Sequence, residues 1–118
     1  MWSAGTRLEG AKALNAVEMH DAQLVSQTVD YEAGTAVLML RVYEGGAAPK
    51  RRLCRLEFSG VEAINQIADL ALLKRNASAG NINAWRVHER PRKTYIDLTE
   101  GCIEVAARSV RLTVVEVG

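Results

Sequence analysis

The run CIEVAARSVRLTVVEV near the C-terminus constrains the fold most, because its apolar positions change phase halfway. Apolar residues occupy odd positions first (Ile103, Val105, Ala107) and even positions afterwards (Val110, Leu112, Val114). Side chains alternate between the two faces of a strand, so a one-residue slip would turn every later side chain to the wrong face. We therefore predict one long, bent strand, with a β-bulge or a sharp bend near Arg108 and Ser109.

Five earlier segments also show the alternation or apolar character of strands. They cover residues 22–31, 35–44, 50–58, 82–90 and 93–99. Gly34 favours a short hairpin turn between the first two, and Glu100-Gly101 favours a tight turn before the final run. The segment 35–44 is apolar on both faces, which predicts a central strand with its second face also covered.

Two segments carry the signals of helix N-termini. Thr6 and Glu9 have capping-box spacing ahead of an apolar stripe, which predicts an N-terminal helical segment within residues 1–18. Ser59 and Glu62 have the same spacing, and apolar residues recur at helical intervals up to Lys74 and Arg75. This pattern predicts a helix over about residues 60–75.

These elements together predict an α+β fold. The chain has 118 residues, a length typical of one domain, so we take residues 1–118 as a single domain. We expect a mostly antiparallel, strongly curved sheet of about six strands with one or two helices. The β-rich body would span residues 20–118.

Composition excludes several classes of function. Fifteen Lys and Arg against fourteen Asp and Glu give a net charge of +1, which does not favour nucleic acid or anionic lipid as a partner. No apolar run approaches the roughly 20 residues that span a bilayer, and the N-terminus lacks the apolar segment of a secretion signal. We expect a cytoplasmic protein that does not bind membranes, with Cys54 and Cys102 as buried thiols.

The pair His20-Asp21 is the first candidate for chemistry. Adjacent residues on an extended chain point to opposite faces, so they make a poor catalytic dyad. We interpret them as the entry to the first strand, with Asp21 in a turn and His20 bonded there. The alternative is a ligand-binding or hydrolytic pocket near His20, Asp21 and His88, the other histidine. The spacings give no metal site, and we identify no catalytic residue and no cofactor.

A basic cluster on the segment 82–93 is the strongest surface feature. Alternation places Arg86, His88 and Arg90 on one face, and Arg92 and Lys93 follow. Such a strand face can bind an acidic protein or protect a sheet edge against aggregation. Trp85 is expected in the core, but if exposed it would join Arg86, His88 and Arg90 in a binding patch.

Three short stretches carry a family resemblance: HDAQL before the first strand, LEFSGVEAI in the middle and LTEGCIEVAA near the end. They resemble small, poorly characterised bacterial proteins, including immunity-like proteins of toxin systems. The resemblance implies an antiparallel sheet with one or two helices. It carries across no enzymatic residues.

We therefore expect a non-enzymatic protein-interaction module that binds another protein through a sheet face or edge, and the resemblance implies an immunity-like role. The alternative function is ligand binding or hydrolysis at the histidine pocket. A third possibility is a structural subunit whose apolar strands are completed in a homodimer.

Overall fold

The computed structural model describes residues 2–44 and 50–116, and these form one sheet with two short helices. The elements are β1 (Arg7–Glu9), α1 (Ala11–Asn15), β2 (Gln23–Asp30), β3 (Thr35–Tyr43), β4 (Arg51–Ile67), α2 (Leu70–Arg75), β5 (Ile82–Glu89), β6 (Arg92–Leu98) and β7 (Gly101–Glu116). The predicted α+β fold with a mostly antiparallel sheet is confirmed, although the sheet has seven strands. Val117, the last residue of the predicted final strand, lies outside the described residues.

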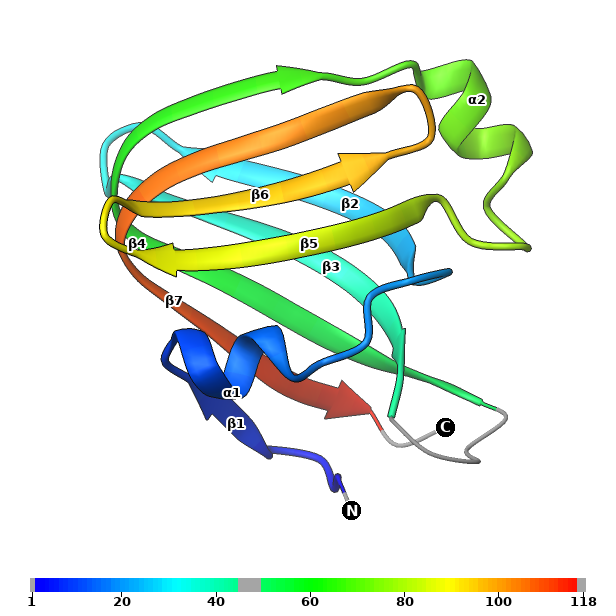
Figure 1. Ribbon diagram of the computed structural model, residues 1–118, viewed down its shortest axis with the longest axis horizontal. Helices are drawn as coiled ribbons and strands as arrows, with labels where there is room; N and C mark the ends of the chain where they lie inside the picture. The colour runs from blue at the N-terminus through cyan, green and yellow to red at the C-terminus, as the bar shows by residue number, and fades with distance from the viewer. Residues whose placement is uncertain (1, 45–49, 117–118) are drawn as a thin grey trace.

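The sheet bends over on itself because its two longest strands, β4 and β7, bend together (Figure 1). The strand order is β2-β3-β4-β7-β6-β5, and β1 also pairs with β7. β3 pairs with residues 51–59 of β4, whereas β6 pairs with residues 101–106 of β7. The first half of β4 thus lies in a layer with β2 and β3, and its second half lies in a layer with β5 and β6.

The corner between the layers lies at Gly60. The register pairs Phe58 with Val110 before the corner and Val61 with Ala107 after it, so in both strands successive inward positions are three residues apart instead of two. Strands that pass between packed layers turn such corners through bends and bulges. Gly60 has a φ of 62°, a conformation that glycine adopts without steric cost.

This corner explains the change of phase in β7. Ile103, Val105 and Ala107 are buried in one layer, and Leu112 and Val114 are buried in the other. The predicted long, bent strand is confirmed, because β7 runs without interruption from Gly101 to Glu116.

The two layers enclose one hydrophobic core. Its fully buried side chains include Leu38, Leu40, Leu56 and Phe58 from one layer and Ile82, Ile96 and Ile103 from the other. β3 is central in its layer, but its outer face is only half-buried at Val37 and Met39. The expectation that this second face is covered was therefore wrong.

The predicted helix over residues 60–75 was wrong in its first half, where β4 continues to Ile67. The spacing of three between Phe58, Val61 and Ile64 comes from the corner and from a register shift between Val61 and Ala63. Two irregularities in one strand thus imitate helical periodicity. The helix begins only after Asp69, whose carboxylate accepts a hydrogen bond of 3.1 Å from the N–H of Leu72.

The N-terminal helical segment is also shorter than predicted. Residues Arg7–Glu9 form β1 on the edge of β7, and the helix α1 covers only Ala11–Asn15. Gly10, with a φ of 83°, separates the two elements and provides no side-chain cap. Pairing with β7 outweighs the weak local preference for helix at Thr6 and Glu9.

The last residue of α1 and the segment after it cover the outer edge of β5. The side-chain amide of Asn15 donates to the carbonyl of Val87 and accepts from its N–H, both at 2.8 Å. The indole Nε1–H of Trp85 donates to the carbonyl of Val17 at 3.2 Å, and the N–H of Asp21 donates to Ile82 at 3.0 Å. The contacts of Asn15 and Asp21 occupy backbone groups of β5 that an edge strand otherwise exposes.

Candidate functional site

His20 and Asp21 lie closer together than extended backbone allows. The φ of Asp21 is 64°, which turns its carboxylate to within 3.6 Å of His20 Nε2. The expectation that they point to opposite faces was therefore wrong. Their side chains are 66% and 57% exposed, so this pair lies on the surface.

His20 fits the structural interpretation. Its Nδ1–H donates to the carbonyl of Asn83 at 3.2 Å, near the beginning of β5. His88 lies near the other end of β5, about 16 Å further along an extended strand. The structure thus brings His20 to Asp21 but not to His88.

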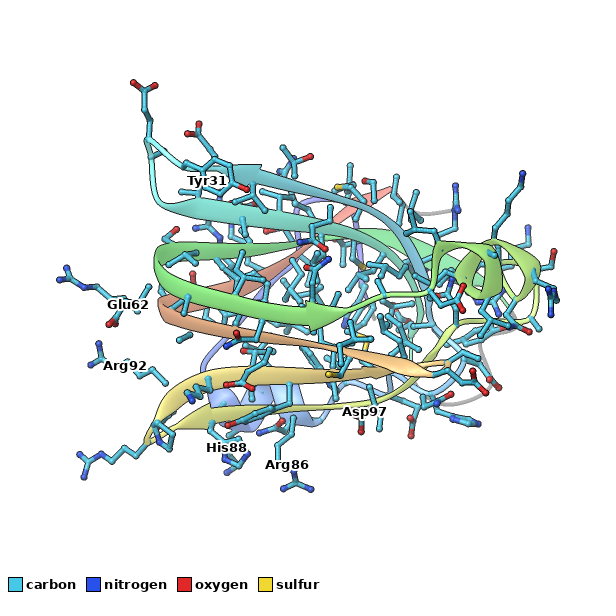
Figure 2. All side chains as sticks on the ribbon, turned by 90° about the horizontal axis from the view of Figure 1, so that it is seen from above. Tyr31, Glu62, Arg86, His88, Arg92 and Asp97 are labelled. Carbon is cyan, nitrogen blue, oxygen red and sulfur yellow. The ribbon has the colours of Figure 1, made fainter. Side chains whose placement is uncertain are left out.

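The basic cluster extends from the outer face of β5 to the turn between β5 and β6. Figure 2 shows Arg86 and His88 projecting from the outer face of β5, where His88 packs edge-on against Tyr95 with ring centroids 5.5 Å apart. Trp85 is half-buried against the core, in agreement with the expected core position. Arg90 lies at the turn between β5 and β6, at the end of the molecule where Figure 2 shows Arg92.

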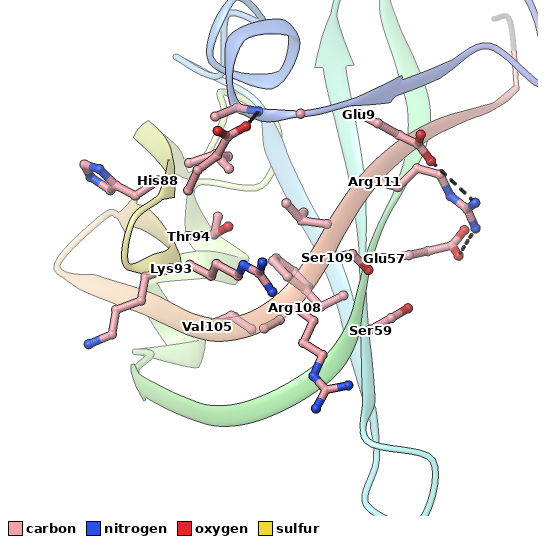
Figure 3. A pocket seen from close by; sticks show the side chains of 18 of the residues that line it. Glu9, Glu57, Ser59, His88, Lys93, Thr94, Val105, Arg108, Ser109 and Arg111 are labelled. Atoms are coloured by element: carbon pink, nitrogen blue, oxygen red, sulfur yellow. Dashed lines mark hydrogen bonds and ion pairs between the residues drawn. The ribbon is translucent and has the colours of Figure 1, made fainter.

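A pocket of about 580 Å³ opens beside the corner of β7 (Figure 3). We call it the corner pocket. Its walls are the turn from β1 into α1, the β5–β6 hairpin and the bent parts of β4 and β7. Apolar side chains line part of it, namely Phe58, Val87, Val105, Ala107 and Val110. Its charged lining residues are Arg90, Arg92, Lys93, Arg108, Arg111, Glu9, Glu57 and Glu89, and His88 also lines it.

The acidic residues of the corner pocket are already engaged. Arg111 bridges Glu57 at 3.0 Å and Glu9 at 3.7 Å, as the dashed lines in Figure 3 show. The carboxylate of Glu89 accepts from the N–H of Ala11 at 3.3 Å. These contacts leave little free negative charge in the pocket.

Within the part of the chain that the structure describes, three cations of the corner pocket have no ion-pair partner. Lys93 is paired with Glu104 at 3.0 Å, and this hydrogen bond raises the pKa of Lys93. Arg90, Arg92 and Arg108 are exposed and make no ion pair with any residue in the described ranges 2–44 and 50–116. The pocket therefore offers three guanidinium groups to an anionic ligand.

Glu57 is held in its ionised form by two neighbouring arginines. Burial alone would raise its pKa, but hydrogen bonds and charges from Arg55 and Arg111 outweigh burial and hold the pKa below its usual value. Arg55 Nε lies 2.6 Å from Glu57 Oε1. Glu57 therefore stays ionised near neutral pH and does not act there as a proton donor.

The sequence predicted Arg90, Arg92 and His88 as part of one basic cluster, but it missed Arg108. The signal for Arg108 was present, because the change of apolar phase places this charged residue at the bend of β7. Glu9 and Arg111 give no such signal, since they meet only through the pairing of β1 with β7.

Neither helix in the described residues is long and apolar enough to cross a membrane, and no cluster of three or more His, Cys, Asp or Glu there is arranged to hold a metal ion. In comparisons with known proteins, no family model, no curated protein and no solved structure matches the chain.

Proposed function

We propose that this protein is a non-enzymatic interaction module whose corner pocket binds an acidic segment of another protein. The observation that supports the proposal is the set of three exposed arginines, Arg90, Arg92 and Arg108, around a partly apolar hollow. Exposed guanidinium groups form bidentate contacts with carboxylates, and Arg is enriched in protein interfaces.

The shape of the pocket supports a peptide segment rather than a lone ion. A volume of about 580 Å³ lies within the range of sites that enclose an organic ligand. Apolar walls such as Val105 and Val110 favour a ligand that carries an apolar side chain between its carboxylates. The resemblance to immunity-like proteins favours a protein as the source of this segment.

Binding of a labelled peptide tests the proposal. The probe is a fluorescein-labelled peptide in which Glu and Asp flank two leucines, and its control has Lys at every acidic position. We expect the acidic peptide to bind in fluorescence anisotropy, and its affinity to fall with added salt. Equal binding of both peptides, or of neither, would contradict the proposal.

Charge reversal in the pocket locates the site. The variant Arg92→Glu/Arg108→Glu is expected to weaken binding about tenfold or more, because two attractive contacts become repulsive. The control Arg7→Glu/Arg75→Glu changes the net charge equally at exposed positions outside the pocket. An equal loss in both variants would show that binding depends on net charge and not on this pocket.

A further inference from the structure

A second open surface lies between β2 and the second half of β4. β3 pairs with β4 only up to Ser59, so residues 62–67 have no strand partner, among the residues described, on the side away from β7. The N–H of Val61 donates to the carbonyl of Gly34 at 2.9 Å and closes one end. Beyond it, Gln27 donates to Gln66 at 2.6 Å across the opening.

Two hollows flank this glutamine bridge, and together with it they form one groove. The hollow next to α2 measures about 570 Å³, and the hollow next to Gly34 measures about 460 Å³. Both are lined by Gln27 and Gln66. We call the two hollows the β2–β4 groove. It shares no lining residue with the corner pocket.

Exposed apolar side chains gather at the β2–β4 groove. Among the described residues, the exposed large hydrophobic side chains are Val25 (45%), Tyr31 (93%), Ile67 (68%), Leu70 (75%) and Val115 (39%). Val25, Tyr31 and Leu70 line the groove, whereas Ile67 lines neither hollow and lies at the end of the unpaired edge of β4. Exposed apolar side chains that cluster in one place mark an interaction surface, whereas single ones scattered over the surface do not.

Among the described residues, none protects the edge of β4 in the way that Asn15 protects the edge of β5. Asn15 and the segment after it occupy the backbone groups of β5, whereas residues 62–67 of β4 carry a single charge, at Glu62, and no proline. Natural proteins usually blunt exposed edges, because a free edge pairs with other strands. An open, six-residue edge of about 20 Å suits the addition of one extended segment.

Charges at the two ends of the groove define what this segment must carry. Arg41 and Lys74 line the end next to α2, and Asp30 and Glu62 line the other end. A segment antiparallel to β4 begins at the α2 end. Its N-terminal residues must therefore be acidic and its C-terminal residues basic.

We propose that the β2–β4 groove binds an extended peptide segment of a partner protein, which adds as an antiparallel strand to residues 62–67 of β4. The segment is acidic at its N-terminal end, β-branched or polar in the middle and basic at its C-terminal end. This site is independent of the corner pocket.

A designed peptide tests strand addition. The probe has two Glu, then Val-Thr-Ile-Thr, then two Lys, with blocked termini and a fluorophore; the matched probe exchanges the Glu and Lys. We expect the first probe to bind wild-type protein at least tenfold more tightly in fluorescence anisotropy. Two further probes carry N-methyl groups at the odd or at the even positions of the peptide. One of them should lose binding and the other should keep it, because only every second residue hydrogen-bonds to the edge.

Variants of the protein locate the groove. Ile67→Lys places a charge beside the edge and is expected to weaken binding of the first probe at least tenfold, whereas Val115→Lys, at an exposed apolar position outside the groove, should change binding less than twofold. If Ile67→Lys fails to fold, judged by circular dichroism, the N-methylated peptides on wild-type protein decide.

Three results of the peptide measurements would overturn the proposal. They are equal binding of the two charge patterns, binding that is insensitive to N-methylation at both the odd and the even positions, and no binding at millimolar peptide. A wild-type dimer in sedimentation that Ile67→Lys dissociates would also overturn it, since the occupant would then be a second copy of the chain.

Discussion

Replacing Gly60 with alanine tests whether the corner of β4 and β7 depends on glycine. Gly60 has a φ of 62°, and an added Cβ would lie 2.9 Å from Cβ, Cγ and Cδ of Arg108. The left-handed conformation costs a residue with a Cβ about 1–2 kcal/mol. Crowding against a neighbour adds about 1–3 kcal/mol. The lower entropy of the unfolded alanine variant offsets about 0.4–1 kcal/mol, so we expect a net loss of about 2–4 kcal/mol.

Gly34 provides a matched control. Its φ is 67°, but an added Cβ would have only the carbonyl oxygen of Val61 nearby, at 4.0 Å. Gly34→Ala should therefore lose only the conformational part, about 0.5–1.5 kcal/mol. The difference between the two variants measures the contact with Arg108.

Equilibrium unfolding in urea measures both variants, with unchanged m-values showing that the unfolded states are comparable. In the double variant Gly60→Ala/Arg108→Ala, the contacts of Cγ and Cδ disappear while that of Cβ remains, so part of the loss should be recovered. Equal destabilisation by Gly60→Ala and Gly34→Ala, within about 0.5 kcal/mol, would refute the reasoning. Gly60→Ala should also weaken binding of the acidic peptide, since it displaces Arg108.

Three further predictions concern the β5 edge, an ion pair and the thiols. Asn15→Ala removes both hydrogen bonds to Val87 and should cost about 1–2 kcal/mol in urea unfolding; an unchanged stability would show that water replaces the amide. Glu57→Gln should cost about 1 kcal/mol at pH 7. Because the folded pKa of Glu57 lies below 4.5, this difference is fully present above pH 4.5 and should disappear as the pH falls through the folded value; unfolding curves of both proteins at several acidic pH values check it. Burial raises the pKa of Cys54 to about 12, so a thiol reagent at pH 8 should label only the partly exposed Cys102 until the protein unfolds; Cys102→Ser should therefore abolish rapid labelling.

Alternation predicted most of the sheet because one face of each strand packs against the core. The predicted strands at residues 22–31, 35–44 and 93–99 agree closely with β2, β3 and β6. The hairpin at Gly34 is confirmed by its φ of 67° and by its N–H, which donates to Asp30. Residues close in the sequence determine these features, so the sequence pattern predicts them.

Features that depend on distant pairing were missed. β1 forms only because the edge of β7 is available to residues 7–9, and the alternation of Arg7, Leu8 and Glu9 is too short to predict a strand. The second half of β4 was assigned to a helix because its corner and register shift give a spacing of three. In both cases the partner strand β7 decides the structure.

In the corner pocket, too, local features were predicted and features that depend on distant pairing were missed. Arg90 and Arg92 come from one hairpin and were predicted together. Arg108 joins them only because β7 bends there, and Glu57 is kept from them by Arg111 through long-range pairing. Sequence reasoning therefore found the basic side of the pocket but not which cations are free.

One corner accounts for both proposed sites. At Gly60, β4 leaves β3, which opens the β2–β4 groove on one side of the strand pair. At the same level β7 passes from β6 to β1, since β6 pairs with it up to Ala106 and β1 pairs with it from Arg111. The interval between those two strands is where the corner pocket opens. A change at Gly60 should therefore affect binding at both surfaces, whereas Arg108→Glu should affect only the corner pocket and Ile67→Lys only the groove.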